Sequence, residues 1–261
     1  MQLANSGDRQ EQTPASERVL KLDKRCQNCP AHHRAICTAL TPEISPLLSA
    51  SMFHRKFRKH EKIWAEGDDT AYFAIIVSGA VKLVKLLADG RQQIVGMFFS
   101  SDCIDNPFSD ENASYAEAAA ETELCCFPKS DFERALTERP ELEHALLLKT
   151  FQDLARTREW LVILGRKNAG ERLASFLVSM MEQSAKFSCR HLPTLPQNVI
   201  FEIPVSRSEI ADYLGLTLET VSRQFSRLKD AGIIDIHEAR FIEVRNQELL
   251  CKAAGEPIRK P

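Results

Sequence analysis

The stretch from Val205 to Gly232, VSRSEIADYLGLTLETVSRQFSRLKDAG, predicts two short helices joined by a tight turn. Ser206 is followed three residues later by Glu209, and this capping box marks the start of the first helix. Gly215 supplies the flexible turn, and Thr217 is suited to cap the second helix. The spacing is that of a helix-turn-helix.

The second helix has two chemically different faces. Its apolar residues step by three or four and predict a buried stripe: Leu218, Val221, Phe225 and Leu228. The opposite face is polar and follows the same spacing: Glu219, Ser222, Arg223 and Ser226. In a DNA major groove, an arginine can donate in a fork to guanine O6/N7, and a glutamate can accept from cytosine N4–H. The polar face therefore predicts base readout.

Ordinary amphipathic helix hairpins with a solvated outer face show the same pattern. The next segment favours DNA binding, because residues 233–236, the polar turn 238–240 and residues 241–244 predict a β-hairpin and hence a winged module. Thr217 and Arg207, at the two helix starts, are further candidate DNA contacts. The formal charge is -2, so a DNA-binding surface must be locally basic, carried by residues such as Arg207, Arg223, Arg227, Lys229, Arg240 and Arg245.

Length and composition exclude several classes of protein. At 261 residues the chain is long enough for two compact domains, and its composition is that of a soluble globular protein. The N-terminus lacks the apolar core of a signal peptide, and no apolar run approaches the roughly 18 residues of a membrane span. We expect a cytoplasmic protein without a membrane partner. No catalytic triad order, paired-carboxylate motif or phosphate-binding glycine loop indicates an enzyme.

Residues 53–127 predict many short strands, and Asp89-Gly90 between two apolar runs is a strong hairpin signal. This spacing predicts an antiparallel β-roll. A long helix follows from Pro140 to about Gly165, with a near-heptad apolar seam: Leu147, Phe151, Leu154, Leu161 and Gly165. Such a seam is typical of a parallel two-stranded coiled coil, or of a helix lying on its own barrel. Asn168, with Glu171 three residues on, begins another capped helix.

The expected fold class is therefore α+β, in four parts. We place a disordered tail and a cysteine-rich arm at 1–45, a β-roll sensor domain at 46–139, a dimerisation helix at 140–167 and a winged helix-turn-helix domain at 168–261. A loop containing Pro193, Pro196 and Pro204 is expected before the helix-turn-helix, and a short frayed tail after Val244.

The arm carries a cysteine triplet in the stretch KRCQNCPAHHRAIC. Cys26, Cys29 and Cys37 follow the pattern C-x2-C-x7-C. Three soft thiolates from one loop suit zinc or an iron–sulfur cluster, and either needs a fourth ligand. His32 or His33 would close a Cys3His zinc site. The distant candidates are Cys103, Cys125, Cys126, Cys189 and Cys251.

The sequence ETVSR at Glu219–Arg223, behind IADYLGLT at Ile210–Thr217, resembles the C-terminal domain of the CRP/FNR superfamily of bacterial transcription regulators. The strand-rich stretch likewise resembles the cyclic-nucleotide-binding fold of that superfamily. Cyclic nucleotide binding there needs a Gly-Glu turn and an Arg-Ser or Arg-Thr pair. The corresponding residues 100–121 contain no Gly and no Arg, and a phosphate would meet Asp102, Asp105, Asp110 and Glu111. We therefore expect no cyclic nucleotide.

The arm resembles that of the oxygen-responsive FNR branch, in particular its alphaproteobacterial members. The resemblance implies an oxygen-labile [4Fe–4S] cluster held by Cys26, Cys29, Cys37 and one cysteine of the barrel. The family cysteine lies three residues before a proline, which selects Cys125 before Pro128, whereas counting from Glu121 selects Cys126. On a strand these neighbours face opposite sides, so only one reaches the arm. The other cysteines are expected to be packing or surface residues.

The resemblance also implies what the protein does. It predicts an anaerobic regulator that binds, as a homodimer, a palindromic site with TTGAT-like half-sites read by Glu219, Ser222 and Arg223, and that contacts RNA polymerase. In the family's best-known oxygen sensor an Asp on the long helix weakens the dimer until the cluster forms. Thr157 stands at that place, so a permanent dimer is the alternative. A zinc-stapled or metal-free constitutive regulator is the alternative to the cluster.

Overall fold

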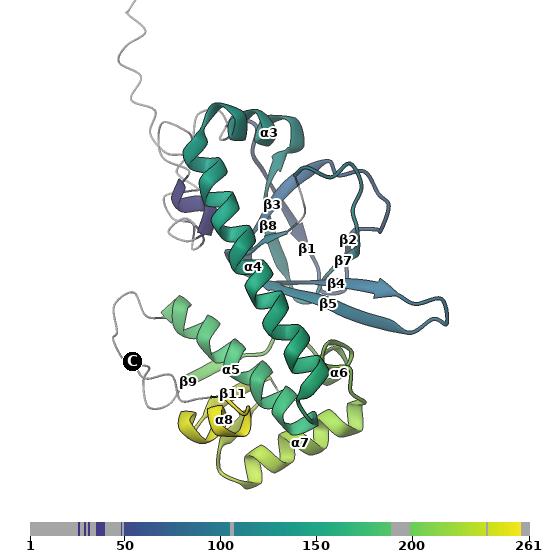
Figure 1. Cartoon of the computed structure of the whole chain (residues 1–261), viewed down its shortest axis with the longest axis vertical. Coiled ribbons are helices and arrows are strands. Elements are labelled where there is room, and N and C mark those ends of the chain that lie inside the picture. Colours follow the sequence, from purple (N-terminus) through teal and green to yellow (C-terminus); the bar gives the residue numbers. More distant parts are fainter. Residues whose placement is uncertain are drawn as a thin grey trace, which may run out of the picture.

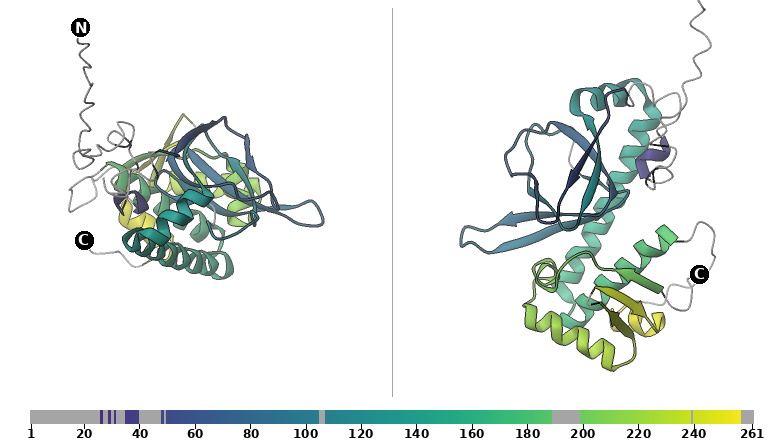
Figure 2. Two further views of the ribbon diagram at one scale, coloured as in Figure 1. Left: turned by 90° about the horizontal axis from the view of Figure 1, so that it is seen from above. Right: turned by 180° about the vertical axis from the view of Figure 1, so that it is seen from behind.

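A computed structural model describes residues 50–104, 107–188, 199–238 and 240–256, with residues 26, 29, 31, 35–39 and 48 of the arm. They form an antiparallel β-barrel, a long helix and a C-terminal domain of helices and a small sheet (Figure 1), which confirms the expected fold class. The long helix runs along the barrel and ends beside the C-terminal domain, as the view from behind also shows (Figure 2). Among the described helices, none combines the length and the apolar character needed to cross a bilayer.

The barrel consists of two four-stranded antiparallel sheets with the orders β1-β8-β3-β6 and β2-β7-β4-β5. The strands are β1 (Phe53–Phe57), β2 (Lys62–Trp64), β3 (Tyr72–Ser78), β4 (Ala80–Leu86), β5 (Gln92–Phe99), β6 (Cys103–Ile104), β7 (Tyr115–Ala118) and β8 (Thr122–Pro128). Side chains from both sheets, among them Ile76, Leu124 and Ala116, are fully buried between them. This inner cluster is the core of the barrel.

The corner between β3 and β4 requires glycine at position 79. Gly79 has a φ of +91°, and a Cβ there would lie 2.3 Å from the carbonyl oxygen of Glu121. The close approach lets the hydroxyl of Thr122 donate to the carbonyl oxygen of Ala80 at 3.0 Å and accept from its amide at 3.2 Å. Since Thr122 belongs to β8 and Ala80 to β4, this corner joins the two sheets.

Two helices connect the barrel to the rest of the chain. In α3 (Lys129–Glu138), Phe132 stacks on Phe73 of the barrel with ring centroids 4.1 Å apart. The long helix α4 (Pro140–Arg166) follows, and the fixed φ of Pro140 suits the first position of a helix. A short 3-10 helix of the arm, η1 (Ala35–Ala39), lies against α4. The arm is thus part of one hydrophobic cluster with the barrel, α3 and α4.

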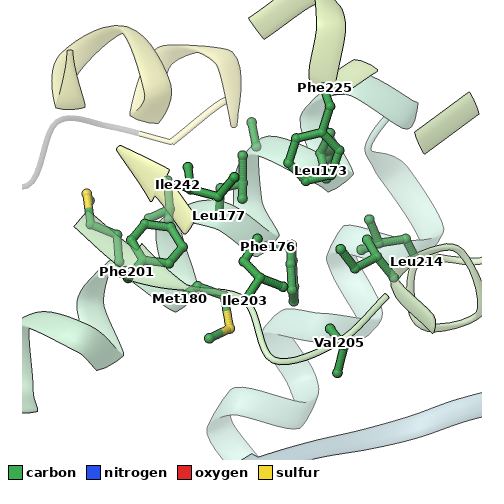
Figure 3. Packing of buried hydrophobic residues seen from close by; sticks show 14 of the residues in the cluster. Leu173, Phe176, Leu177, Met180, Phe201, Ile203, Val205, Leu214, Phe225 and Ile242 are labelled. Carbon is green, nitrogen blue, oxygen red and sulfur yellow. The ribbon is translucent and has the colours of Figure 1, made fainter. Parts of the chain in front are cut away.

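The C-terminal domain has one apolar core, shown in Figure 3. Its elements are α5 (Ala169–Ser188), β9 (Val199–Glu202), α6 (Arg207–Leu214), α7 (Leu218–Asp230), β10 (Ile234–His237), β11 (Phe241–Val244) and α8 (Gln247–Ala253). As expected, α5 begins with a capping box, because Asn168 Oδ1 accepts from the amide of Glu171 at 3.1 Å and Glu171 Oε2 accepts from that of Asn168 at 2.8 Å. Leu173, Phe201 and Phe225 all belong to this core (Figure 3).

Several elements differ from the sequence expectation. Strand β9 lies within the segment expected to be a proline-containing loop, and pairs with β11 to make the wing three-stranded. The expectation of a frayed tail after Val244 is wrong for α8, because Asn246 caps this helix and Leu250 is fully buried. Other expectations fall on residues outside the described part of the chain: the N-terminal tail, His32, His33, Asp105, Cys189, Pro193 and Pro196.

Candidate nucleic-acid interface and thiol cluster

Local capping fixes the start of the helix-turn-helix, as the sequence predicted. The hydroxyl of Ser206 accepts from the amide of Glu209 at 3.2 Å, and Glu209 Oε2 accepts from the amide of Ser206 at 2.8 Å. Gly215 ends α6 in the left-handed conformation with a φ of 61°. Thr217 then caps α7, since its hydroxyl accepts from the amide of Thr220 at 3.3 Å. The turn between the helices is therefore defined at both ends.

The two faces of α7 separate as predicted, with one exception. Three of the four stripe residues are buried: Val221, Phe225 and Leu228. Leu218, expected in the stripe, is 45% exposed instead. It is the first residue of α7, where the Cα–Cβ bond tilts towards the helix N-terminus and away from the domain. Gln224 is buried in addition, and no sequence pattern predicts this burial of a polar side chain.

The polar face of α7 is open to solvent. All four of its residues are exposed: Glu219, Ser222, Arg223 and Ser226. The backbone amide of Glu219 and the hydroxyl of Thr217 lower the pKa of the Glu219 carboxyl. Glu219 is therefore a charged acceptor at neutral pH, as reading a cytosine amino group requires.

The basic residues near this face fall into two groups. Three pair with acids of their own domain: Lys229 with Asp235, Arg240 with Glu202, and Arg245 with Asp235 and Glu243. Within the described ranges, Arg223 and Arg227 have no such ion pair. These two exposed side chains are the cations best placed to meet DNA.

Arg207 plays a different part from the one expected of an open basic residue. Its guanidinium lies over the ring of Phe225, with Cζ 3.1 Å from the ring centroid. Burial lowers the pKa of Arg207 to about 10. The contact joins the first residue of α6 to the buried face of α7, so the two helices hold each other in orientation.

The structure brings cysteines from the arm and the barrel to one apolar cluster. Cys29 and Cys37 of the arm, Cys103 of β6 and Cys125 of β8 all pack against it. Cys103 and Cys125 flank the same β3 residue, Ile75, in the sheet register. Cys126 points the other way and is fully buried in the barrel core. Alternation along β8 thus directs Cys125 towards the arm.

The thiols of the arm and of the barrel raise one another's pKa. Burial raises the pKa of Cys37, and Cys103, Cys125, Cys29 and Cys26 raise it further. Burial likewise raises the pKa of Cys125, with additional contributions from Cys26, Cys126, Cys29 and Glu123. Several buried thiolates in one place repel each other, so bound cations would offset this repulsion and displace the protons. The donor set fits a soft metal centre held by thiolates.

Cys103, which the sequence placed among the distant candidate ligands with a packing role expected, is also a member of this thiol cluster. It packs against the same hydrophobic cluster as Cys29 and Cys37 of the arm, and it raises the pKa of Cys37. Burial raises the pKa of Cys103 itself to about 12. No local pattern identifies this position, because the short strand β6 is placed only by its pairing with β3.

Comparisons with known proteins match both domains of the chain. Residues 54–139 match the model of the cyclic nucleotide-binding domain, and residues 171–253 match that of the Crp-like helix-turn-helix domain. A probable transcriptional activator of Rhizobium leguminosarum bv. viciae is 38% identical over 86% of this chain and 91% of its own length. FnrL of Cereibacter sphaeroides is 34% identical over 89% of this chain and 92% of its own length.

Solved structures show the same architecture. FixK2 from Bradyrhizobium japonicum superposes with a TM-score of 0.69 at 32% identity, covering 80% of this chain and 99% of that one. A β-barrel, a long helix and a winged helix-turn-helix with an open polar face define a DNA-binding transcription regulator and not an enzyme. The chain belongs to the CRP/FNR superfamily of these regulators, and its relatives include FnrL- and FixK-type activators.

Proposed function

We propose that this regulator responds to oxygen through a [4Fe–4S] cluster held by Cys26, Cys29, Cys37 and Cys125. As a homodimer it would bind a two-fold-symmetric DNA site with TTGAT-like half-sites and activate transcription anaerobically through contact with RNA polymerase. The observation that carries the proposal is the convergence of arm and barrel thiols on one buried cluster. When bound, an iron–sulfur cluster supplies a redox-active centre tuned by its ligands and by its exposure to solvent.

The protein's own residues connect such a centre to the long helix. Cys37 lies in η1, which packs against α4, and Cys125 lies in β8 on the facing side of the same hydrophobic cluster. Binding both thiols would fix the arm against the barrel and against α4. Cys126 faces the core of the barrel, so it could bind such a centre only if the two faces of β8 were exchanged.

A single zinc ion and an iron–sulfur cluster need different spacings of their ligand atoms. One tetrahedral zinc with thiolate ligands at about 2.3 Å brings its ligand atoms to within about 4 Å of each other. In the described part of the chain, no three cysteine, histidine or acidic ligand atoms that include a cysteine lie within 4.8 Å of one another. A centre of several irons spans a wider set of sulfurs. Zinc held with His32 or His33 is the competing proposal.

An exposed apolar face on α4 supports the homodimer. Leu147, Phe151, Leu154 and Leu161, the seam residues with large side chains, are between 40% and 65% exposed. Coiled-coil pairing of two copies would cover this face. Thr157 is exposed on the same helix and its hydroxyl donates to the carbonyl of Asp153 at 2.8 Å, so no acidic side chain at 157 opposes pairing.

Two-fold pairing would present both copies of α7 to DNA. Recognition helices must lie about one helical turn apart, roughly 34 Å, to enter successive major grooves. Glu219, Ser222 and Arg223 would read each half-site, and Arg227 would contact phosphate.

Two of the four acids expected to exclude a cyclic phosphate, Asp102 and Asp110, have ion-pair partners within the protein. Asp102 pairs with Lys149 at 3.2 Å, and Asp110 pairs with Lys129 at 2.8 Å. These pairs use both lysines internally. We therefore retain the proposal that this barrel takes no cyclic nucleotide.

Spectroscopy of protein purified without oxygen tests the proposed cofactor. Wild type should be brown, show the Mössbauer parameters of a [4Fe–4S] centre and bleach in air. Cys125→Ser should lose the cluster, whereas Cys126→Ser, a change at the adjacent position on the opposite face, should keep it. A colourless wild type that retains zinc would overturn the cluster in favour of the zinc staple.

A further inference from the structure

The barrel contains a buried lysine that does not belong to the thiol cluster. Lys82 is in the middle of β4 and is only 6% exposed. A buried ammonium group is costly unless acidic groups surround it. Lys82 has two: its Nζ donates to Glu117 Oε1 of β7 at 2.9 Å and to Glu209 Oε1 of α6 at 2.7 Å. One partner is in the sensor barrel and the other is in the DNA-binding domain.

Both carboxylate oxygens of Glu209 accept hydrogen bonds. While its Oε1 accepts from Lys82, its Oε2 accepts from the amide and the hydroxyl of Ser206, both at 2.8 Å. Burial alone would raise the pKa of Glu209, but the hydrogen bonds from Lys82 and Ser206 outweigh it and lower the pKa. The same pairing outweighs burial at Lys82 and raises its pKa. Both groups are therefore charged at neutral pH.

Further contacts hold α6 against the barrel and against α4. Gln92 Nε2 donates to Asp212 Oδ2 and Gln93 Nε2 to the carbonyl of Asp212, each at 2.7 Å. On the other side, Trp160 of α4 stacks on Tyr213. Figure 1 shows α6 between the β4–β5 hairpin and the lower end of α4. The first helix of the helix-turn-helix is thus the element that both the barrel and α4 contact.

A set of possible metal ligands lies at the same place. A ring nitrogen of His60 and carboxylate oxygens of Glu117 and Glu209 lie within 4.8 Å of one another. Lys82 donates to both of these carboxylates, so its ammonium group already provides the cation that they require. The arrangement is an ion-pair network between domains and not a vacant metal site.

We infer that Lys82 is a positioning residue for DNA recognition: by holding Glu209 it fixes α6, and with it the reading face of α7, relative to the barrel and the dimerisation helix. The link from α6 to α7 is the contact of Arg207 with Phe225. In a two-fold complex, a rotation of α6 would misplace both reading faces at once. Specific binding requires that alignment, whereas non-specific binding depends chiefly on phosphate charge.

Lys85 provides a matched control on the same strand. It lies three residues further along β4, carries the same charge and pairs with Glu66 of the barrel. Lys82→Gln and Lys85→Gln therefore make the same change in net charge. Only the first removes a contact with α6.

The test measures binding of full-length protein, purified anaerobically, to a duplex with two inverted TTGAT half-sites and to a scrambled duplex. Lys82→Gln should weaken specific binding by about tenfold to a hundredfold and leave scrambled binding unchanged. Lys85→Gln should bind like wild type, and Lys82→Arg should recover most of the loss. Equal binding by Lys82→Gln and wild type, or an equal loss in Lys85→Gln, overturns the inference.

Glu209→Gln gives a second route if Lys82→Gln does not fold. Glutamine keeps the acceptor for Ser206 but removes the charge that faces Lys82, so the same loss of specificity is expected. The double variant should lose no more than either single variant, because both remove one interaction. Additive losses would contradict the inference. Sensitivity of wild-type binding to air is a separate readout, so failure of the cluster proposal leaves this comparison interpretable.

Discussion

The indole of Trp160 stacks on the phenol of Tyr213, with ring centroids 4.2 Å apart and planes inclined by 16°. Trp160 belongs to α4 and Tyr213 to α6, so the stack joins the proposed dimerisation helix to the helix-turn-helix. Phe176 of α5 meets the edge of the Tyr213 ring at 6.1 Å. Three helices of different function therefore meet at one aromatic site.

Trp160→Ala should destabilise the protein by about 3 kcal/mol, because it removes a large packed ring and leaves Tyr213 without the ring that stacks on it. Trp160→Phe should cost less than about 1 kcal/mol. The indole Nε1 is buried without a hydrogen-bond partner among the described residues, so phenylalanine keeps the stack and removes an unsatisfied donor. Urea unfolding followed by circular dichroism measures both. A phenylalanine variant as unstable as the alanine variant would contradict the stacking explanation.

Arg223→Ala should weaken specific DNA binding by about 1–3 kcal/mol through loss of one bidentate base contact, and should relax preference at a single base position. Arg227→Ala is the comparison, since Arg227 is an exposed cation on the same helix. It should weaken binding to all sequences alike and reduce the salt slope by about 1. Titrations at several salt concentrations separate the two. An Arg223 variant with full sequence preference would exclude it from base readout.

Acid should remove the stabilisation that Glu209 provides. Its folded-state pKa is lowered, so this stabilisation is fully present above the unfolded value of about 4.3 and is lost as the pH falls through the folded value. The charged groups facing it are Lys82 and Glu117, with His60 Nδ1 at 3.9 Å. The difference in unfolding free energy between wild type and Glu209→Gln should therefore shrink below about pH 4. A difference independent of pH would rule out this charge effect.

Leu161→Glu should convert the proposed dimer into a monomer, because it places a charge within an apolar seam. Leu161 is 65% exposed in the single chain, so its replacement leaves the protomer's own core intact. Leu86→Glu is the control, since Leu86 is 67% exposed on the barrel. Sedimentation equilibrium distinguishes the two variants. A monomeric wild type, or a dimeric Leu161→Glu variant, would argue against pairing through this face.

Features set by neighbours in the sequence could be predicted. The caps at Ser206, Asn168 and Thr217 depend on residues three positions apart, and the structure contains all three. The opposite orientation of Cys125 and Cys126 follows from the two-residue period of a strand. Which of them faces the arm is decided by the position of β8 between β1 and β3, which no local pattern reveals.

Features that join distant segments could not be predicted in this way. Lys82 and Glu209 are 127 positions apart, and each alone resembles an ordinary charged residue on an amphipathic element. Cys103 approaches the arm only because β6 pairs with β3. Leu218 follows the apolar spacing but is the first residue of its helix, where it stays exposed.

Because Glu209 contacts both Ser206 and Lys82, the domains of this regulator cannot be exchanged freely with those of other proteins. Its carboxylate both starts α6 and receives the barrel's lysine, so the same side chain serves the domain's own folding and its attachment to the sensor. A chimera that transplants the C-terminal domain onto a foreign sensor would therefore leave an orphaned acid at the junction. Such a chimera should bind DNA with more sequence specificity when the recipient barrel is given a cation opposite that position.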